Sequence, residues 1–242
     1  MYEKILSEIH DRWFGHIAEG AAEEIRNSAD DLIPFRIADL GCGSGTLLEK
    51  LKENCSEMHG FDISDEMIRR CRKRLPEGSF STGNILNIRI PKVNIISMVG
   101  EILSYALAEE GALEKVNGFF QRIYESLENN GIFIFDILGN RHDYSGNFIH
   151  ERSEFSIFSR VTADKDIVKR EIISFRKIKK SYRKSFEIHR LRMLDEDHLT
   201  GLLRDSGFSV RKLEKYGKEP ILPGRIAFEC RKSLQQTRLG GN

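Results

Sequence analysis

The stretch RIADLGCGSGTLLEKL, residues 36–51, decides the fold of this chain. Its apolar start predicts a short buried strand at 36–40, and its end predicts a helix that begins near Ser44, with Ser44 as the N-cap. The turn between them contains three glycines, Gly41, Gly43 and Gly45. Glycine adopts positive φ without strain and leaves the main chain bare, and a helix N-terminus presents unpaired N–H groups. The stretch therefore predicts a site where a ligand lies against the backbone.

A second strand and an acidic residue follow this turn. Residues 57–61 predict another short strand, and Asp62 stands at its end. In nucleotide-binding βαβ units, an acid roughly twenty residues after the turn accepts hydrogen bonds from a ribose diol. An ionised carboxylate suits this role because it only accepts hydrogen bonds. A glycine turn after a strand can be no more than a turn, but the order strand, turn, helix, strand and acid favours a nucleotide site.

The spacing of the glycines distinguishes two kinds of nucleotide site. In the dinucleotide fingerprint GxGxxG the third glycine would stand at position 46, where this chain has Thr46. The pattern DxGxGxG that begins at Asp39 instead resembles motif I of the class I S-adenosylmethionine-dependent methyltransferases. DISDEM, residues 62–67, resembles the next motif of that family. The similarity continues through VNIISMVGEILSYAL and GIFIFDIL to EIHRLRMLDEDHLTGLLRDSGF and YGKEPILPGRIAFECRK near the C-terminus, so it covers nearly the whole chain.

This resemblance implies an α/β fold, with a Rossmann-like seven-stranded sheet that has one antiparallel edge strand. The continuous apolar run at 131–138 agrees, since strands buried on both faces are typical of parallel sheets covered by helices. The alternating pattern of residues 153–192 predicts three antiparallel strands in a small β lobe inserted after the fifth strand. We expect a helical cap at 1–34, a cofactor-binding domain at 35–145 and 193–232, the lobe at 146–192, and a disordered tail at 233–242.

Two further elements are expected around this core. Residues 111–130 predict an amphipathic helix that ends at Asn129–Asn130–Gly131, a sequence typical of a helix C-cap. Segments 208–216 and 225–231 predict two strands joined by a short loop, which must therefore be antiparallel. Ser64 and Asp195 stand where each would cap a helix.

The resemblance also implies which residues hold S-adenosylmethionine. The backbone of the glycine turn would face the methionine part, Asp39 would hold the loop and favour the ammonium, and Asp62 would bind the ribose. The family commonly has an acid where this chain has Asn84, whose carbonyl oxygen can still accept a hydrogen bond from the adenine amino group. The full set of expected cofactor residues is Asp39, Gly41, Cys42, Gly43, Asp62, Ile63, Met67, Asn84, Ile85, Val99 and Gly100.

The candidates on the substrate side are Glu101, Tyr105, His10 and His189. Glu101 and Tyr105 follow the fourth strand, at the sheet edge where such folds bind ligands, although a carboxylate there can also be a plain surface group. A single histidine is more often structural than catalytic. The N-terminal helix with Tyr2, His10 and Trp13 fits either a helix packed on the sheet or a lid over the cofactor. Methyl transfer is an in-line displacement that depends on alignment, and a base is needed only when the acceptor must lose a proton.

The function predicted is direct methyl transfer to a small-molecule acceptor, and three alternatives stay open. One is an RNA methyltransferase that uses the basic segment FRKIKKSYRK, residues 175–184, which can equally be an exposed hairpin tip. Another is an NAD(P)-dependent oxidoreductase on a Rossmann core, against which stand the early third glycine and the lack of a YxxxK pair. The last is a protein that binds S-adenosylmethionine without catalysing transfer.

Composition excludes several other classes. The 242 residues carry a net charge of +1, which gives no general attraction to nucleic acid or to anionic membranes. The four cysteines form no CxxC pair, so we expect no metal, and their scatter fits a reducing, cytoplasmic compartment. No apolar run approaches the ~20 residues of a membrane span, and the N-terminus lacks a signal-peptide core. The oligomeric state does not follow from the sequence.

Overall fold

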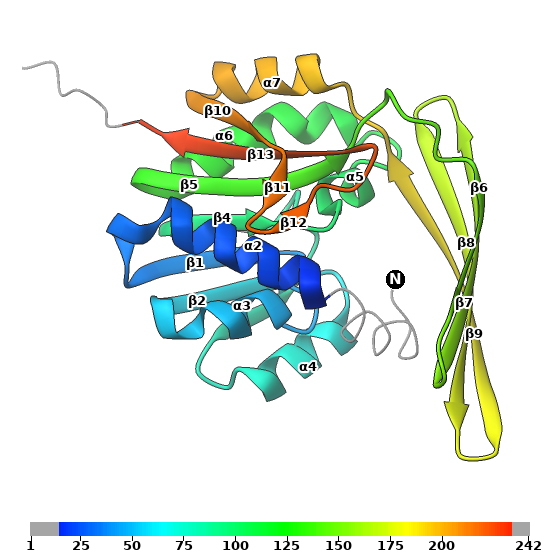
Figure 1. The fold of residues 1–242 in the computed structure, drawn as a ribbon. Helices are drawn as coiled ribbons and strands as arrows, with labels where there is room; N and C mark the ends of the chain where they lie inside the picture. The colour runs from blue at the N-terminus through cyan, green and yellow to red at the C-terminus, as the bar shows by residue number, and fades with distance from the viewer. Residues whose placement is uncertain (1–14, 234–242) are drawn as a thin grey trace, which may run out of the picture.

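The computed structural model describes residues 15–233 (Figure 1). The first part of the expected helical cap and the expected tail beyond residue 233 lie outside this range. The described part of the cap is helix α2 (Gly15–Ser28), which packs on the sheet beside α3.

The large sheet has seven strands in the order β10-β13-β5-β4-β1-β2-β3. Its strands are β1 (Phe35–Leu40), β2 (Cys55–Asp62), β3 (Ser79–Thr82), β4 (Val93–Met98), β5 (Leu127–Leu138), β10 (Phe208–Leu213) and β13 (Arg225–Lys232). Strand β13 is antiparallel to both β5 and β10, whereas β1 to β5 pair in parallel. The expected fold is therefore confirmed, and its reversed strand lies one place in from the edge strand β10.

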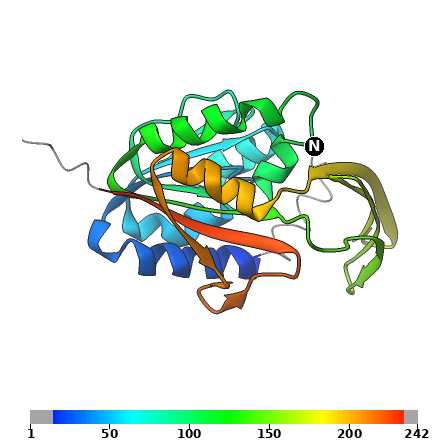
Figure 2. The same cartoon turned by 90° about the horizontal axis from the view of Figure 1, so that it is seen from above.

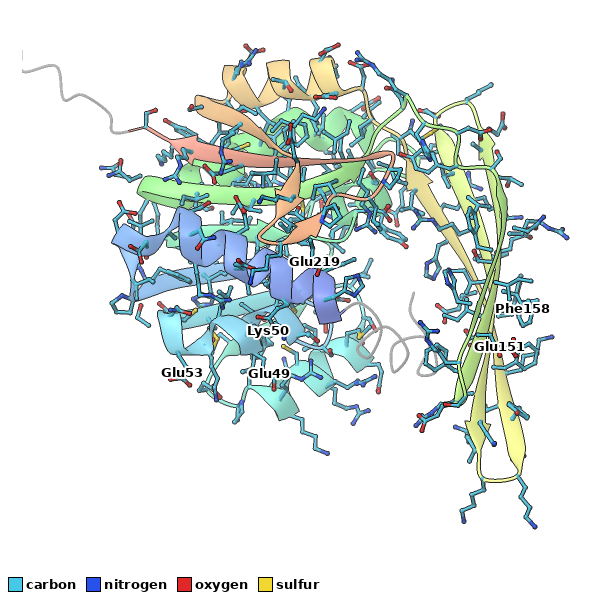
Figure 3. The ribbon with its side chains drawn as sticks, viewed as in Figure 1. Glu49, Lys50, Glu53, Glu151, Phe158 and Glu219 are labelled. Carbon is cyan, nitrogen blue, oxygen red and sulfur yellow. The ribbon has the colours of Figure 1, made fainter. Side chains whose placement is uncertain are left out.

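Helices cover both faces of this sheet, with α6 and α7 on one face and α2 and α3 on the other (Figure 2). The helices after α2 are α3 (Thr46–Leu51), α4 (Asp65–Arg74), α5 (Ile102–Ala106), α6 (Val116–Ser126) and α7 (Glu196–Asp205). Three short 3-10 turns lie at Asp30–Leu32, Lys52–Asn54 and Leu113–Lys115. Strand β5 contributes side chains to two apolar cores. Phe133 and Phe135 pack under α6 and α7, whereas Ile132 and Ile134 pack towards α2 and α3. This explains why its apolar run is continuous. On the second face, Lys50 of α3, which is labelled in Figure 3, forms an ion pair with Glu19 of α2.

The helix caps agree with the sequence in two places and differ in one. The Ser64 side chain accepts a hydrogen bond from Met67 N, and the Asp195 side chain accepts one from His198 N. Helix α3 is capped by Gly45 in the left-handed conformation, with φ of 84°, and not by Ser44 as predicted. A Cβ on Gly45 would come within 2.6 Å of the Cys71 sulfur, so both the backbone and the packing require glycine there.

The segment after α6 is also different from the prediction. The helix ends at Ser126, and residues predicted to end it belong to β5, which begins at Leu127. The predicted helix C-cap at residues 129–131 was wrong, but Asn130 does adopt the left-handed conformation typical of such a cap, with φ of 61°. The pairing of β5 with β4 shifts register between Val93 and Ile95, so the left-handed residue belongs to an irregularity in the strand.

The inserted lobe is a sheet of four antiparallel strands and not three. They are β6 (Gly146–Glu151), β7 (Phe155–Asp164), β8 (Ile167–Ile178) and β9 (Ser181–Arg192), paired in sequence order. The extra strand is β6, in the segment between the fifth strand and residue 153. The lobe stands beside the end of the large sheet at which β5 ends (Figure 1). One face of the lobe carries exposed apolar side chains such as Phe158 (Figure 3), and the other contains buried polar groups.

A two-stranded hairpin lies between β10 and β13 in the chain. It consists of β11 (Lys215–Tyr216) and β12 (Glu219–Pro220), and it packs on α2, where a Cβ on Gly20 would clash with the Tyr216 carbonyl oxygen. Within residues 15–233, none of the helices combines the length and apolar character that a membrane crossing requires.

Candidate functional site

Two neighbouring cavities lie at the carboxyl ends of the central strands, where an open α/β sheet binds its ligands. The smaller, of about 170 Å³, is lined by the glycine turn, the end of β4 and the lobe residue Arg170. The larger, of about 590 Å³, is lined by the residues after β2 and β3 and by lobe residues 188–190. Gly41 and Tyr105 line both cavities, so the two adjoin at these residues.

The glycine turn presents bare main chain to the smaller cavity. The N–H groups of Gly41 and Cys42 donate to the Phe61 carbonyl oxygen at 2.7 and 3.0 Å, which ties the turn to the end of β2. Gly43 has φ of 54°, and a Cβ built on it would meet no atom within 4 Å. The space beside Gly43 therefore belongs to the cavity, and a side chain there would occupy it.

Asp62 connects the turn to the larger cavity. Its Oδ2 accepts a hydrogen bond from Gly43 N at 3.0 Å and its Oδ1 accepts one from Ser64 N at 2.8 Å. Burial raises the pKa of this carboxyl, and the N–H groups of Ser64 and Gly43 oppose that rise. Each oxygen keeps acceptor capacity for a ligand hydroxyl.

The far end of the larger cavity has a mixed lining. Ile63 and Ile85 supply apolar surface, and Asn84 lies beside them. The Asn84 side-chain oxygen already accepts a hydrogen bond from Leu86 N at 2.9 Å, which fixes its orientation. A flat apolar ring with a polar edge fits such a lining.

Asp39 is the carboxyl behind the glycine turn. It is buried, and its Oδ1 accepts a hydrogen bond from the Ser97 hydroxyl at 2.8 Å. Burial raises the pKa of Asp39 to about 7, with a smaller contribution from Asp62, although the Ser97 hydroxyl opposes the shift. A cationic ligand in the smaller cavity would therefore favour the ionised form.

Glu101 holds two guanidinium groups at the floor of the smaller cavity. Its carboxylate accepts two hydrogen bonds from Arg170, at 2.8 and 3.1 Å, and one from Arg225 Nε at 3.0 Å. Burial alone would disfavour its charge, but Arg225 and Arg170 outweigh it and lower the pKa of Glu101 to about 2. A carboxylate with so low a pKa is a poor proton acceptor at neutral pH, so Glu101 suits anchoring better than base catalysis.

Asp136 fixes the loop that carries these residues. It is fully buried, and it accepts hydrogen bonds from the N–H groups of Gly100 and Glu101 and from the Tyr216 hydroxyl. Burial raises the pKa of this carboxyl, and the Arg225 charge opposes that rise. The left-handed residue Glu101, with φ of 62°, is therefore held at the start of α5 by a polar network.

Tyr105 of α5 meets the lobe through a histidine. The Tyr105 hydroxyl lies 3.1 Å from His189 Nδ1, and the two rings meet edge to face. His189 Nε2 in turn lies 3.1 Å from Oε2 of Glu187. Both lobe side chains are buried, at 3 % and 4 % exposure.

The structure brings most of the predicted residues together. Six line the smaller cavity, namely Asp39, Gly41, Cys42, Gly43, Val99 and Gly100. Asp62, Ile63, Asn84 and Ile85 line the larger one, and the substrate-side candidates Glu101, Tyr105 and His189 line one cavity or both.

One described residue of the predicted set is not part of these linings. Met67 is buried and is absent from both, and His10 lies outside the described residues. Sequence reasoning missed Arg170, Arg225 and Glu187, since an isolated arginine or glutamate on an alternating strand carries no signal. Across residues 15–233, no three His, Cys, Asp or Glu side chains are arranged to hold a metal ion.

Comparison with known proteins agrees with this geometry. Residues 37–131, which contain the glycine turn, Asp62 and the end of β4, match the family described as "Methyltransferase domain". The solved structure of an S-adenosylmethionine-dependent methyltransferase from Clostridium acetobutylicum superposes with a TM-score of 0.82 over 94% of this chain and 98% of that one, at 20% identity. Residues 37–131 therefore match a methyltransferase domain, and the described chain has the fold of an S-adenosylmethionine-dependent methyltransferase.

Curated relatives of this methyltransferase domain match over shorter stretches. A dTDP-3-amino-3,4,6-trideoxy-alpha-D-glucopyranose N,N-dimethyltransferase from Streptomyces venezuelae is 25% identical over 145 residues, 55% of this chain and 57% of the relative. A trans-aconitate 2-methyltransferase from Rhodopseudomonas palustris (strain BisB5) is 36% identical over 66 residues, 26% of each chain. The matches thus span about half of the first relative's length and about a quarter of the second's.

Proposed function

We propose that this chain catalyses methyl transfer from S-adenosylmethionine to a small-molecule acceptor. The observation that carries the proposal is a pair of adjoining cavities, with bare glycine backbone and Asp39 in one and Asp62 in the other. The two cavities suit the two halves of the cofactor, because a buried carboxylate favours a cation and a carboxylate beside a helix N-terminus accepts from hydroxyls.

The residues present fit this cofactor. The open space beside Gly43 would admit the methionine part, Asp62 would accept from the ribose, and Ile63, Asn84 and Ile85 would lie beside the adenine. When bound, S-adenosylmethionine supplies an electrophilic methyl group on a sulfonium. Tyr105 and Gly41 lie at the junction of the two cavities, so the acceptor would enter beside them.

The proposed domains divide this work. Residues 35–145 and 193–232 bind the cofactor, and the lobe at 146–192 contributes Arg170 and His189 to the acceptor side. For the acceptor itself we propose an amino sugar, since the relative from Streptomyces venezuelae is named for an amino-sugar substrate. The cytoplasmic location and the absence of nucleic-acid and membrane partners stay predictions.

Calorimetry with S-adenosylmethionine tests the cofactor half of the proposal. We expect Asp62→Ala to weaken binding by about 1–3 kcal/mol, the cost of a lost charge-assisted hydrogen bond. Asp65→Ala is the matched control, because Asp65 is an exposed acid three residues on that lines neither cavity.

Two outcomes would contradict the proposal. Unchanged affinity in Asp62→Ala would remove Asp62 from the site, and binding of NADH in place of S-adenosylmethionine would favour the oxidoreductase alternative. Formation of S-adenosylhomocysteine with any acceptor excludes the purely binding alternative.

A further inference from the structure

A chain of three polar side chains, two of them buried, connects the lobe to the junction of the two cavities. It runs from Glu187 through His189 on β9 to Tyr105 on α5. Glu187 and His189 are two residues apart on one strand, so they face the same side of the lobe. His189 lines the larger cavity, whereas Tyr105 lines both and therefore lies at the proposed position of methyl transfer.

The directions of the hydrogen bonds follow from the resting state that the proposal assumes, which is an ionised Glu187 and a neutral His189 ring. An ionised Glu187 carboxylate can only accept, so His189 Nε2 must carry the proton of a neutral ring. His189 Nδ1 is then the unprotonated nitrogen and accepts from the Tyr105 hydroxyl at 3.1 Å. The phenol oxygen keeps acceptor lone pairs, as every hydroxyl does while it donates. In this arrangement Tyr105 can pass its own proton to His189 and accept a proton from a ligand.

Among the described residues, the charge that faces His189 from β8 is already paired. On β8, the register partner of His189 is Arg170, whose charge would disfavour a protonated imidazole. The guanidinium of Arg170 is held by both oxygens of Glu101, a carboxylate that stays ionised because its pKa is about 2. The partner of Glu187 on β8 is the apolar Ile172, and α5 contributes Tyr105. Glu187 is therefore the acid in direct contact with the His189 ring.

Glu187 is costly if its only role is structural. Its side chain is 4 % exposed, and no donor among the described residues reaches its Oε1. Burying a carboxylate with one oxygen unsatisfied is unfavourable, whereas a neutral amide could hold His189 Nε2–H equally well. A negative charge at this place is useful where His189 becomes positively charged during the reaction.

We propose that Tyr105, His189 and Glu187 form a proton relay, and that the methyl acceptor is therefore a nitrogen or oxygen that carries a proton. The inference rests on the proposed methyl transfer and adds the residues that would take up the acceptor proton. Tyr105 is the catalytic residue, and His189 and Glu187 act through it.

The relay accounts for every atom and electron of the step. The acceptor lone pair forms the new N–C or O–C bond, and the S–C bond breaks with its electron pair left on sulfur. The acceptor proton moves to the Tyr105 oxygen while the Tyr105 proton moves to His189 Nδ1. The resulting imidazolium is stabilised by Glu187 and returns its proton to water after release. A carboxylate acceptor has no proton to lose at neutral pH and would need no relay.

The His189 tautomer gives a test that requires no acceptor. In protein labelled with ¹⁵N-histidine, the His189→Asn variant identifies the His189 signals in a long-range ¹H–¹⁵N spectrum at about pH 8, above the ordinary imidazole range. We expect the proton on Nε2, and we expect Glu187→Gln to shift the Nε2–H resonance. A proton on Nδ1, or a resonance that Glu187→Gln leaves unmoved, would overturn the relay.

Kinetics tests the acceptor class. With dTDP-3-amino-3,4,6-trideoxy-α-D-glucopyranose and related amino sugars as probes, we expect kcat to fall about 100-fold in Tyr105→Phe and roughly 10- to 100-fold in Glu187→Gln, with little change in acceptor KM. Trans-aconitate serves as the carboxylate probe. Transfer to it that Tyr105→Phe leaves unchanged, in the absence of transfer to any amine or hydroxyl, would overturn the acceptor class.

Matched controls separate catalysis from packing. Ser185→Ala removes a buried hydroxyl from the same face of β9, where it pairs with Ser174, and Tyr182→Phe removes an exposed phenol from the same strand. Both should keep wild-type kcat. If the chain only tied β9 to α5, Glu187→Gln would lower stability and leave kcat unchanged, which contradicts the relay. Failure to bind S-adenosylmethionine would instead refute the proposed function, and the histidine spectrum would still decide the relay.

Discussion

Asp39 is a residue whose charge changes within the physiological pH range. Its pKa is raised from 3.8 to about 7, chiefly by burial. A carboxyl that holds its proton more tightly in the folded state stabilises the fold at low pH, and this contribution is lost as pH rises from about 4 to about 7. Without ligand, Asp39 therefore makes the protein less stable at higher pH.

This behaviour gives a prediction for Asp39→Asn. The amide keeps an oxygen for the Ser97 hydroxyl but carries no titrating proton, so the free energy of unfolding should depend less on pH between about 4 and 7. Urea unfolding at a series of pH values measures this. Asp62 and Asp136 also have raised pKa values, so only the difference from wild type belongs to Asp39.

The pH dependence of S-adenosylmethionine binding tests whether Asp39 lies near the positive charge of the ligand. An ammonium or sulfonium near Asp39 favours its ionised form, so S-adenosylmethionine affinity should rise with pH through about 7 in wild type and not in Asp39→Asn. Affinity with the same pH dependence in both proteins would place the cation of the ligand elsewhere.

Single residues also show where sequence reasoning ends. Asp62 could be predicted because its distance from the glycine turn is part of a local motif. The cap of α3 could not, because the choice of Gly45 over Ser44 depends on the Cys71 sulfur, which a Cβ at position 45 would approach to 2.6 Å. That contact comes from α4, and no local pattern contains it.

The Glu101 carboxylate connects three elements, namely the start of α5, the strand β8 and the strand β13. Glu101 binds Arg170 from 69 positions along the chain and Arg225 from 124 positions along it. Removing one partner of a buried ion pair leaves an uncompensated charge, which costs more than the pair itself contributes. The lobe should therefore loosen when this contact is broken.

Glu101→Gln should lower the free energy of unfolding by about 3 kcal/mol, the usual cost of breaking a buried pair. Urea unfolding measures the loss, and hydrogen exchange should become faster in β8. Lys169→Ala is the matched control, because Lys169 is the neighbouring residue of β8 and pairs with Glu171 in a more exposed position. Equal effects of the two substitutions would mean that Glu101 does not anchor the lobe.

Element boundaries were predicted where local periodicity decided them. The first residues of α4 and α7 follow from the N-caps Ser64 and Asp195, whose side chains accept hydrogen bonds within the first turn of each helix. The start of β5 was wrong because Asn130 and Gly131 suit either a helix end or a strand irregularity, and the pairing with β4 selects the second. The strand β6 was missed because only its pairing with β7 makes that short segment a strand.

At the scale of the whole molecule, the sequence predicted the sheet and the lobe but not the way in which they meet. The seven-stranded sheet follows from the resemblance of the motifs, whereas Arg170, His189 and Glu187 gain their roles only when the lobe stands against α5. The site is therefore formed by two parts of the chain, each of which the sequence predicts separately, while the contact between them is not predicted.

The basic hairpin tip is a feature of the whole molecule that no cavity uses. Lys177, Lys179, Lys180 and Lys184 are exposed at the end of the β8–β9 hairpin, and none of them lines the site. With a net charge of only +1, the molecule has no wider positive field to support this tip. We therefore expect the tip to be a solvated turn and not a contact for RNA.

Replacing these four lysines by glutamine should leave S-adenosylmethionine affinity and transfer to a small acceptor unchanged. The matched control is Lys52→Gln with Lys73→Gln, which removes exposed charge from the cofactor-binding domain. An RNA methyltransferase would behave differently, because each lost phosphate contact lowers the slope of log affinity against log salt by roughly 0.7 for a single strand. Tight, salt-dependent RNA binding that disappears with the four lysines, and persists in the control, would replace the small-molecule acceptor with RNA.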